Sequence, residues 1–207
     1  EDMQDDWTMV PVMRNLWAFD WKCMQCGHRT YQGPTPTSCS KCDNTAKFTR
    51  RIRWVGKENP QSVSYCFDSE PHFQYFKEYT QRPEYKKMLA ETQLTESMSL
   101  QGSFFLMTRA KYWELNICDE NAGSWGNQGI EIACATWLSG GRVVVSTKTW
   151  YAHLFRTQGG DFSFPYPQSG RDVEKTKIYI KNKFWKQNSS TQIYPVSWLV
   201  SKFWPVP

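Results

Sequence analysis

The chain has 207 residues, enough for one substantial domain with its own core. It contains 25 Lys and Arg against 20 Asp and Glu, and this net charge of +5 suits a phosphate-bearing ligand but is too small to indicate nucleic-acid binding. No stretch reaches the roughly 18 apolar residues that a membrane-spanning helix needs, and no secretory leader is recognisable. We therefore expect a cytoplasmic protein without a membrane span.

Two Cys-x-x-Cys pairs, twelve residues apart, follow the first predicted strand at residues 8–17. Two such turns can offer four thiolates to a tetrahedral Zn²⁺ at about 2.3 Å, which leaves no open position for a substrate. Two disulfides or a redox pair are the alternatives, and a cytosolic chain with both pairs in a loop favours them less. The sequence predicts a structural zinc ribbon over residues 20–55. Its ligands are Cys23, Cys26, Cys39 and Cys42.

A basic strand is predicted to return from this ribbon at residues 47–55, with Arg50, Arg51 and Arg53 facing solvent. The aromatic run at 67–79 fits a helix or an extended segment, and 84–99 is expected to be a polar loop after a short helical start. His28, next to the second cysteine, is expected outside the ligand set.

The second half of the chain alternates predicted strands and helices, which indicates an α/β fold. Residues 102–107 are expected to form a buried strand and residues 109–115 a short helix. After a turn at 119–126, apolar residues at i, i+3, i+4, i+7 and i+8 predict a one-sided helix that ends at Gly140-Gly141. A β-branched strand follows at 142–147. Ser169 and Asp172 are candidates to cap a final helix.

Several short motifs in this half occur in a characteristic order. They are Gly102-Ser103-Phe104-Phe105, Asp119-Glu120, Trp125-Gly126-Asn127-Gln128-Gly129-Ile130-Glu131, Trp137, Gly140-Gly141 and His153-Leu154-Phe155-Arg156. In order and spacing they resemble family 2 glycosyltransferases of the GT-A fold, above all the branch that includes polypeptide N-acetylgalactosaminyltransferases, and phage and bacterial relatives with a zinc-knuckle insert. The resemblance implies the C-terminal half of a GT-A mixed sheet flanked by helices. Residues 1–207 would then be a single domain that lacks its nucleotide-binding half, with the ribbon as an insert.

The resemblance also assigns residues to the sugar and the acceptor. It places Gly102 and Ser103 in the floor of the donor-sugar pocket, and Trp125 with Gly126 in the turn that presents the acceptor-side carboxylate. Many relatives have Glu where this chain has Gln128, and an amide cannot accept the proton of an acceptor hydroxyl. Glu131 is therefore the remaining candidate for the general base, expected to point into the cleft. Taken alone, a Glu near a helix start is usually a surface charge.

For the metal, the resemblance assigns His153 as a ligand of Mn²⁺ or Mg²⁺ and lets Arg156 pair with the donor phosphates. A lone His after a strand is, without the family, more often structural. The other metal ligands, an Asp-x-Asp pair, are expected upstream of Glu1, so we expect a fragment that binds nucleotide sugar poorly alone.

Two functions follow from these motifs. The first is sugar transfer from a nucleotide-sugar donor, a UDP-sugar, to a glycan, protein or small-molecule acceptor. The alternative is a non-enzymatic zinc-ribbon module in which the basic strand at 50–53 contacts nucleic acid or protein. The first explains more residues, because the module leaves the motifs between Gly102 and Arg156 without a role.

Overall fold

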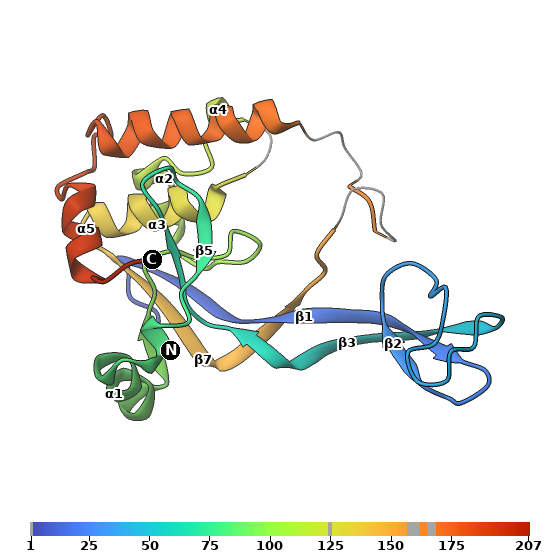
Figure 1. Cartoon of the computed structure of the whole chain (residues 1–207). Helices are drawn as coiled ribbons and strands as arrows, with labels where there is room; N and C mark the ends of the chain where they lie inside the picture. The colour runs from blue at the N-terminus through green and yellow to red at the C-terminus, as the bar shows by residue number, and fades with distance from the viewer. Residues whose placement is uncertain (1, 124–125, 157–161, 165–168) are drawn as a thin grey trace. The chain divides into compact units, whose positions relative to one another are not determined.

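The computed structural model describes residues 2–123, 126–156, 162–164 and 169–207 (Figure 1). The chain forms two compact units. The first comprises Glu1–Val12, Ser62–Trp150 and Gln168–Pro207, and the second Met13–Gln61 and Tyr151–Pro167. Each is described by itself. No helix in the described ranges is long and apolar enough to cross a bilayer.

One mixed sheet with strand order β2-β1-β7-β6 supplies the framework, and β3 also pairs with β1. The β1/β2 and β6/β7 pairs are antiparallel. A separate antiparallel pair, β4 with β5, belongs to the first unit. The strands are β1 (Trp7–Cys23), β2 (Arg29–Tyr31), β3 (Phe48–Ser62), β4 (Tyr65–Phe67), β5 (Phe73–Tyr75), β6 (Leu94–Glu96) and β7 (Arg142–His153).

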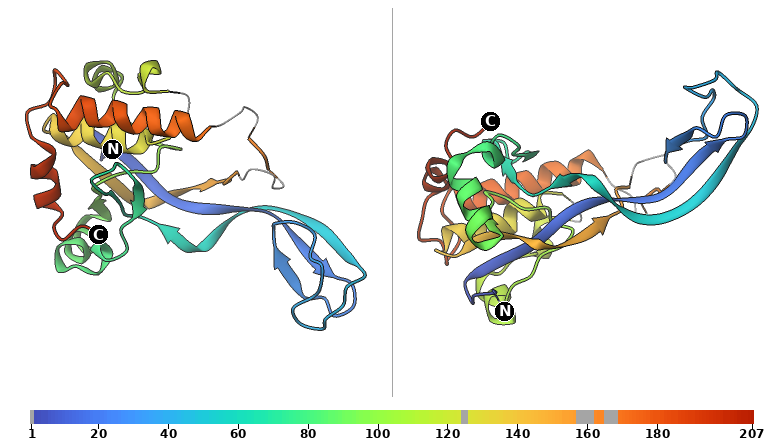
Figure 2. Two further views of the ribbon diagram at one scale, coloured as in Figure 1. Left: turned by 45° about the horizontal axis from the view of Figure 1, so that its top comes forward. Right: turned by 90° about the horizontal axis from the view of Figure 1, so that it is seen from below.

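The helices belong to the first unit, where α3 and α4 run beside one another in both views (Figures 1 and 2). A π-helical turn, η3, continues α4. The helical segments are η1 (Tyr79–Gln81), α1 (Pro83–Thr92), α2 (Arg109–Leu115), η2 (Glu120–Ala122), α3 (Gln128–Leu138), α4 (Gly170–Ile180), η3 (Lys181–Trp185) and α5 (Val196–Lys202).

Helix α3 is buried on all sides, so the prediction of a one-sided helix is wrong. Every residue from Gly129 to Leu138 is buried. Its polar residues find partners inside the protein: the hydroxyls of Thr136 and Thr8 on β1 are 2.6 Å apart, and the Trp137 indole donates to the Ser97 carbonyl at 3.0 Å. Because these groups are satisfied in the interior, the helix needs no solvent-facing side.

Two other expectations are also wrong. Residues 102–107 form no strand beyond a single bridge between Leu106 and Met9, and Phe104 and Leu106 are exposed. In the stretch 84–99 the expected helical start is present as α1, but the helix is longer than expected and strand β6 follows it where a loop was predicted. Helix α1 starts with Pro83 in its first turn and packs through the buried ring of Tyr85, so one apolar anchor and a proline at the start are sufficient.

The remaining predicted elements are present, with longer strands than expected, but the predicted basic face of β3 is wrong in part, because Arg51 and Arg53 are half-buried while Ile52 and Trp54 are exposed. Strand β1 contains the predicted 8–17, and α2 has the predicted bounds. Strands β3 and β7 are longer than the strands predicted at 47–55 and 142–147. The aromatic run at 67–79, for which a helix or an extended segment was expected, contains strand β5. The Ser169 side chain accepts from the Asp172 amide at 3.2 Å and caps α4 as expected.

Candidate functional site

The segment around Gly102 packs directly against the start of α3. A Cβ added to Gly102 would lie 3.0 Å from the Gly129 amide nitrogen and 3.3 Å from the Gln128 Cβ. A Cβ on Gly129 would collide with the Leu100 carbonyl oxygen. Glycine at both positions therefore permits the close approach of two backbones, and the structure brings the predicted residues Gly102 and Gln128 together.

The turn before α3 ends in two residues with positive φ. Gly126 has φ +101°, a value that favours glycine, and Asn127 follows at φ +54°. Trp125 lies outside the described residues. The exposed Ser103 has its backbone N–H bonded to the Gln101 side chain at 3.0 Å.

The Glu131 carboxylate lies in the interior and does not point into a cleft. The residue is 3% exposed, its Oε1 is 3.0 Å from the Lys183 ammonium, and its Oε2 accepts from the Cys118 amide at 3.2 Å. Burial raises the pKa of Glu131, and Lys183 opposes that shift. The contacts observed are those of a positioning group that ties α3 to η3 and to the chain at Cys118. Its assignment as general base stays a prediction.

Lys183 is the residue that the sequence did not reveal. It is 52 positions from Glu131, and its ammonium also donates to the Asn116 carbonyl at 2.8 Å. The available signal was chemical: a carboxylate on a helix without a polar face requires a buried cation. Near these groups Gln128 is exposed and its amide donates to the Cys118 sulfur at 3.1 Å.

His153 and Arg156 belong to the second unit, whereas Gly102, Gln128 and Glu131 belong to the first. His153 ends β7, half-buried, and its ring packs edge-on against Phe155 with centroids 4.5 Å apart. Burial lowers the pKa of His153 and so favours the neutral imidazole that a metal ligand requires. The exposed Arg156 donates to the Ser163 carbonyl at 2.9 Å.

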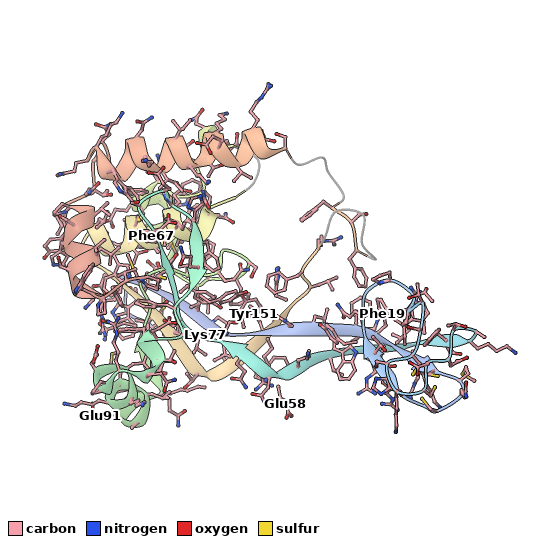
Figure 3. The ribbon with its side chains drawn as sticks, viewed as in Figure 1. Phe19, Glu58, Phe67, Lys77, Glu91 and Tyr151 are labelled. Carbon is pink, nitrogen blue, oxygen red and sulfur yellow. The ribbon has the colours of Figure 1, made fainter. Side chains whose placement is uncertain are left out.

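The four predicted zinc ligands form a compact cluster of sulfur atoms, seen in yellow at the loop end of β1 and β3 (Figure 3). All four sulfurs lie within 4.8 Å of one another, with 3.7 Å between Cys23 and Cys42 and 3.6 Å between Cys26 and Cys39. Four sulfurs at about 2.3 Å from a tetrahedral zinc are about 3.8 Å apart. The donor set and its spacing therefore fit Zn²⁺. Among the described residues no other group of three or more His, Cys, Asp or Glu has this property, and His153 is in none.

The two Cys-x-x-Cys turns repeat one hydrogen-bond pattern. In the first turn the Gly27 amide donates to the Cys23 carbonyl at 3.0 Å, and the Cys23 amide donates to the His28 carbonyl at 2.9 Å. In the second turn the Asp43 amide donates to the Cys39 carbonyl, and the Cys39 amide donates to the Asn44 carbonyl, both at 2.9 Å. Gly27 and Asp43 both have positive φ, +73° and +54°. This repetition directs both thiols of each pair to one side of its turn.

The thiols ionise unequally because they share one small space. The backbone amide of Cys26 and the side-chain amide of Asn44 donate hydrogen bonds to the Cys23 sulfur and lower the pKa of Cys23 to about 6. A backbone hydrogen bond from Asn44 lowers the pKa of Cys42, but burial and the other three thiols outweigh it and raise this pKa to about 12. One thiolate forms readily and disfavours the next, a conflict that a divalent cation would relieve. His28 bonds to Ser40 at 3.0 Å, outside the ligand set as expected.

The fold has a counterpart among solved structures. The chain aligns with the crystal structure of GalNAc-T7 with UDP, GalNAc and Mn²⁺ at a TM-score of 0.58 and 15% identity, covering 89% of this chain and 28% of that one. The fold is that of a GT-A glycosyltransferase. The expected fold class, a mixed sheet flanked by helices in this architecture, is therefore confirmed.

The chain is also similar in sequence to N-acetylgalactosaminyltransferases. The chain is 28% identical over 134 residues to a putative polypeptide N-acetylgalactosaminyltransferase 13 of Drosophila melanogaster, covering 64% of this chain and 21% of that protein. It is 26% identical over 110 residues to a probable N-acetylgalactosaminyltransferase 6 of Caenorhabditis elegans, covering 53% and 18%. The chain thus spans about a fifth of the length of these relatives. No family model matches it.

Proposed function

We propose that the protein containing this chain transfers a sugar from a UDP-sugar to an acceptor hydroxyl with the help of a divalent cation. The shared fold of GalNAc-T7, crystallised with UDP, GalNAc and Mn²⁺, carries this proposal. The similarity to polypeptide N-acetylgalactosaminyltransferases over 64% of the chain supports it and favours a polypeptide among the possible acceptors.

The proposed roles are those that the resemblance implies, and the chemistry of each side chain suits its role. The neutral imidazole of His153 would bind Mn²⁺ or Mg²⁺ together with ligands from outside the described residues. When bound, the cation would neutralise negative charge on the leaving nucleotide. Arg156 would pair with the donor phosphates after giving up its bond to Ser163. Gly102 and Ser103 would lie beneath the donor sugar, with the missing side chain of Gly102 serving its close packing against Gly129 and Gln128.

On the acceptor side, Trp125 and Gly126 would form the turn that leads into α3. Gln128 is exposed and can donate or accept a hydrogen bond to a substrate hydroxyl, but it cannot take its proton. Glu131 could act as base only after its carboxylate leaves Lys183 and reaches solvent. We therefore propose that Glu131 positions the start of α3, and that a base role requires this rearrangement.

Nucleotide binding tests the proposal without depending on the acceptor. UDP with Mn²⁺ should raise the melting temperature of the protein that contains this chain, and His153→Ala should abolish the increase. His72→Ala is the matched control, because His72 pairs with Asp68 and Lys177 on the first unit. An absent increase, or one that His153→Ala preserves, would refute the proposal. Tight, salt-dependent RNA binding without UDP binding would establish the zinc-ribbon module instead.

We also propose that Cys23, Cys26, Cys39 and Cys42 hold one structural Zn²⁺. The sulfur spacing and the repeated turn geometry support it. Metal analysis of protein purified without chelator should find about one zinc per chain. Cys39→Ser should lose the metal, whereas Cys118→Ser, a thiol outside the cluster, should keep it. Protein free of zinc would exclude this site.

A further inference from the structure

All of the excess positive charge belongs to the second unit. Met13–Gln61 and Tyr151–Pro167 contain ten Lys and Arg against four Asp and Glu, a net charge of +6. The rest of the chain contains 15 against 16, a net charge of −1. The modest overall charge therefore conceals one strongly basic unit, whose field attracts an anionic partner.

Strand β3 gives this basic unit a long strand edge. It runs for 15 residues, Phe48–Ser62, and among the described residues it pairs with β1 alone. A strand paired on one side presents unpaired N–H and C=O groups along its other side. Such an edge is a template for an added strand unless the protein blocks it.

The exposed side chains of β3 combine apolar and basic character. Ile52 is 61% exposed, Trp54 56% and Val55 41%. Alternation along the strand is interrupted where Trp54 takes φ +52°, so that Trp54 and Val55 both face solvent. A left-handed Trp is uncommon and costs energy, and such outliers concentrate at binding sites. The Trp54 ring packs on one side against Phe162, with centroids 6.3 Å apart, and remains more than half exposed.

Three cations of β3 are held against aromatic rings of β1 and β2, which reduces the side-chain entropy they would lose on binding. The pairs are Arg50 over Phe19 at 5.3 Å, Arg53 over Trp17 at 4.9 Å and Lys57 over Tyr31 at 4.1 Å. Figure 3 marks Phe19 on β1 and Glu58 on β3.

We propose that the free edge of β3 binds an extended acidic segment of a polypeptide partner as an added strand. The basic side chains would pair with its carboxylates, and Trp54 and Ile52 would pack against its apolar residues. A polypeptide fits this surface better than a nucleic acid, because only a peptide backbone can match the spacing of the N–H and C=O groups on a strand edge. This binding surface does not depend on the transfer reaction.

Fluorescence anisotropy with labelled 15-residue peptides tests the surface on the whole chain. The probe peptide alternates Glu with Thr and Val, and comparison peptides replace Glu by Gln or carry N-methyl groups on alternate amides. We expect the Gln and N-methyl peptides to bind about tenfold more weakly than the probe, and 0.5 M salt to weaken the probe similarly. Arg50→Glu/Lys57→Glu should cost at least tenfold.

Lys86→Glu/Lys175→Glu is the matched control, since it reverses two exposed charges on the first unit. It should leave peptide affinity within twofold of the parent. Circular dichroism establishes that both variants fold. Equal binding of the N-methyl peptide would refute strand addition, and no binding of the acidic peptide would refute the surface. Tighter binding of a single-stranded DNA 15-mer than of the peptide would assign the surface to nucleic acid and overturn the proposal.

Discussion

Removal of the Lys183 ammonium should destabilise the first unit strongly. In Lys183→Ala the Glu131 carboxylate, 3% exposed, keeps only the Cys118 amide as a partner. Leaving one member of a buried ion pair without its partner costs about 3–5 kcal/mol. With an m-value of about 2 kcal/mol per molar urea, a loss of about 3 kcal/mol lowers the urea midpoint by about 1.5 M. Tryptophan fluorescence in a urea titration measures that shift.

The pH dependence of the stability of Lys183→Ala tests whether the loss comes from the charge of Glu131. Burial raises the pKa of Glu131 above its ordinary 4.5, and loss of Lys183 removes a group that opposes the increase. A carboxyl group with a raised pKa in the folded state stabilises fully below its unfolded pKa and loses that contribution as pH rises through the folded value. The deficit of Lys183→Ala relative to the parent should therefore be small near pH 4.5 and grow towards pH 8.

Two controls separate the lost ion pair from a lost side chain. Lys186→Ala removes an exposed ammonium from the end of the same helical segment and should change stability by less than about 0.5 kcal/mol. Glu131→Leu/Lys183→Met replaces the pair by apolar side chains and should recover most of the stability. If Lys183→Ala matched Lys186→Ala, or if its deficit were constant with pH, the assigned role of this pair would be wrong.

Two further substitutions probe the packing of α3. Gly129→Ala directs a methyl group at the Leu100 carbonyl and should lower the free energy of unfolding by more than about 2 kcal/mol, despite the better helix propensity of Ala. The control is Gly170→Ala, which has nothing within 4 Å and should leave stability unchanged. Equal melting temperatures for the two variants would contradict this account of the packing. Thr136→Val leaves the buried Thr8 hydroxyl without its partner and should lower the free energy of unfolding, measured by urea titration, by about 1–3 kcal/mol. The loss should be smaller in Thr8→Val/Thr136→Val, which removes both hydroxyls. An unchanged urea midpoint in Thr136→Val would contradict this hydrogen bond.

Short-range sequence patterns were sufficient to predict part of this fold. The two Cys-x-x-Cys spacings predicted the sulfur cluster because the geometry of each turn depends on four or five neighbouring residues. The bounds of α2 followed in the same way, with the Thr108 side chain capping its first turn. Residues 102–107 misled the prediction, because a short apolar run resembles a buried strand while Phe104 and Leu106 are in fact exposed.

Parts of the candidate site depend on residues far apart in the sequence. The order of the motifs led to the GT-A fold, and Gly102 does meet Gln128, but the surroundings of Glu131 depend on Lys183, 52 residues away. The residue types indicate that Glu131 needs a cation, but neither they nor the spacing identify Lys183 as that cation. The burial of α3 likewise depends on Thr8, 128 residues from its partner Thr136. Long-range partners of buried polar groups decide these features, and a single sequence does not record them.

The measurement that tests the central claim most directly is the initial rate of sugar transfer from UDP-sugars to a polypeptide acceptor, with Mn²⁺, by the protein that contains this chain. We predict Mn²⁺-dependent transfer that falls at least about 100-fold in His153→Ala, since a metal ligand supports stabilisation worth several kcal/mol. His72→Ala should retain the parent rate. Absence of transfer from every UDP-sugar, or an undiminished rate in His153→Ala, would contradict the account.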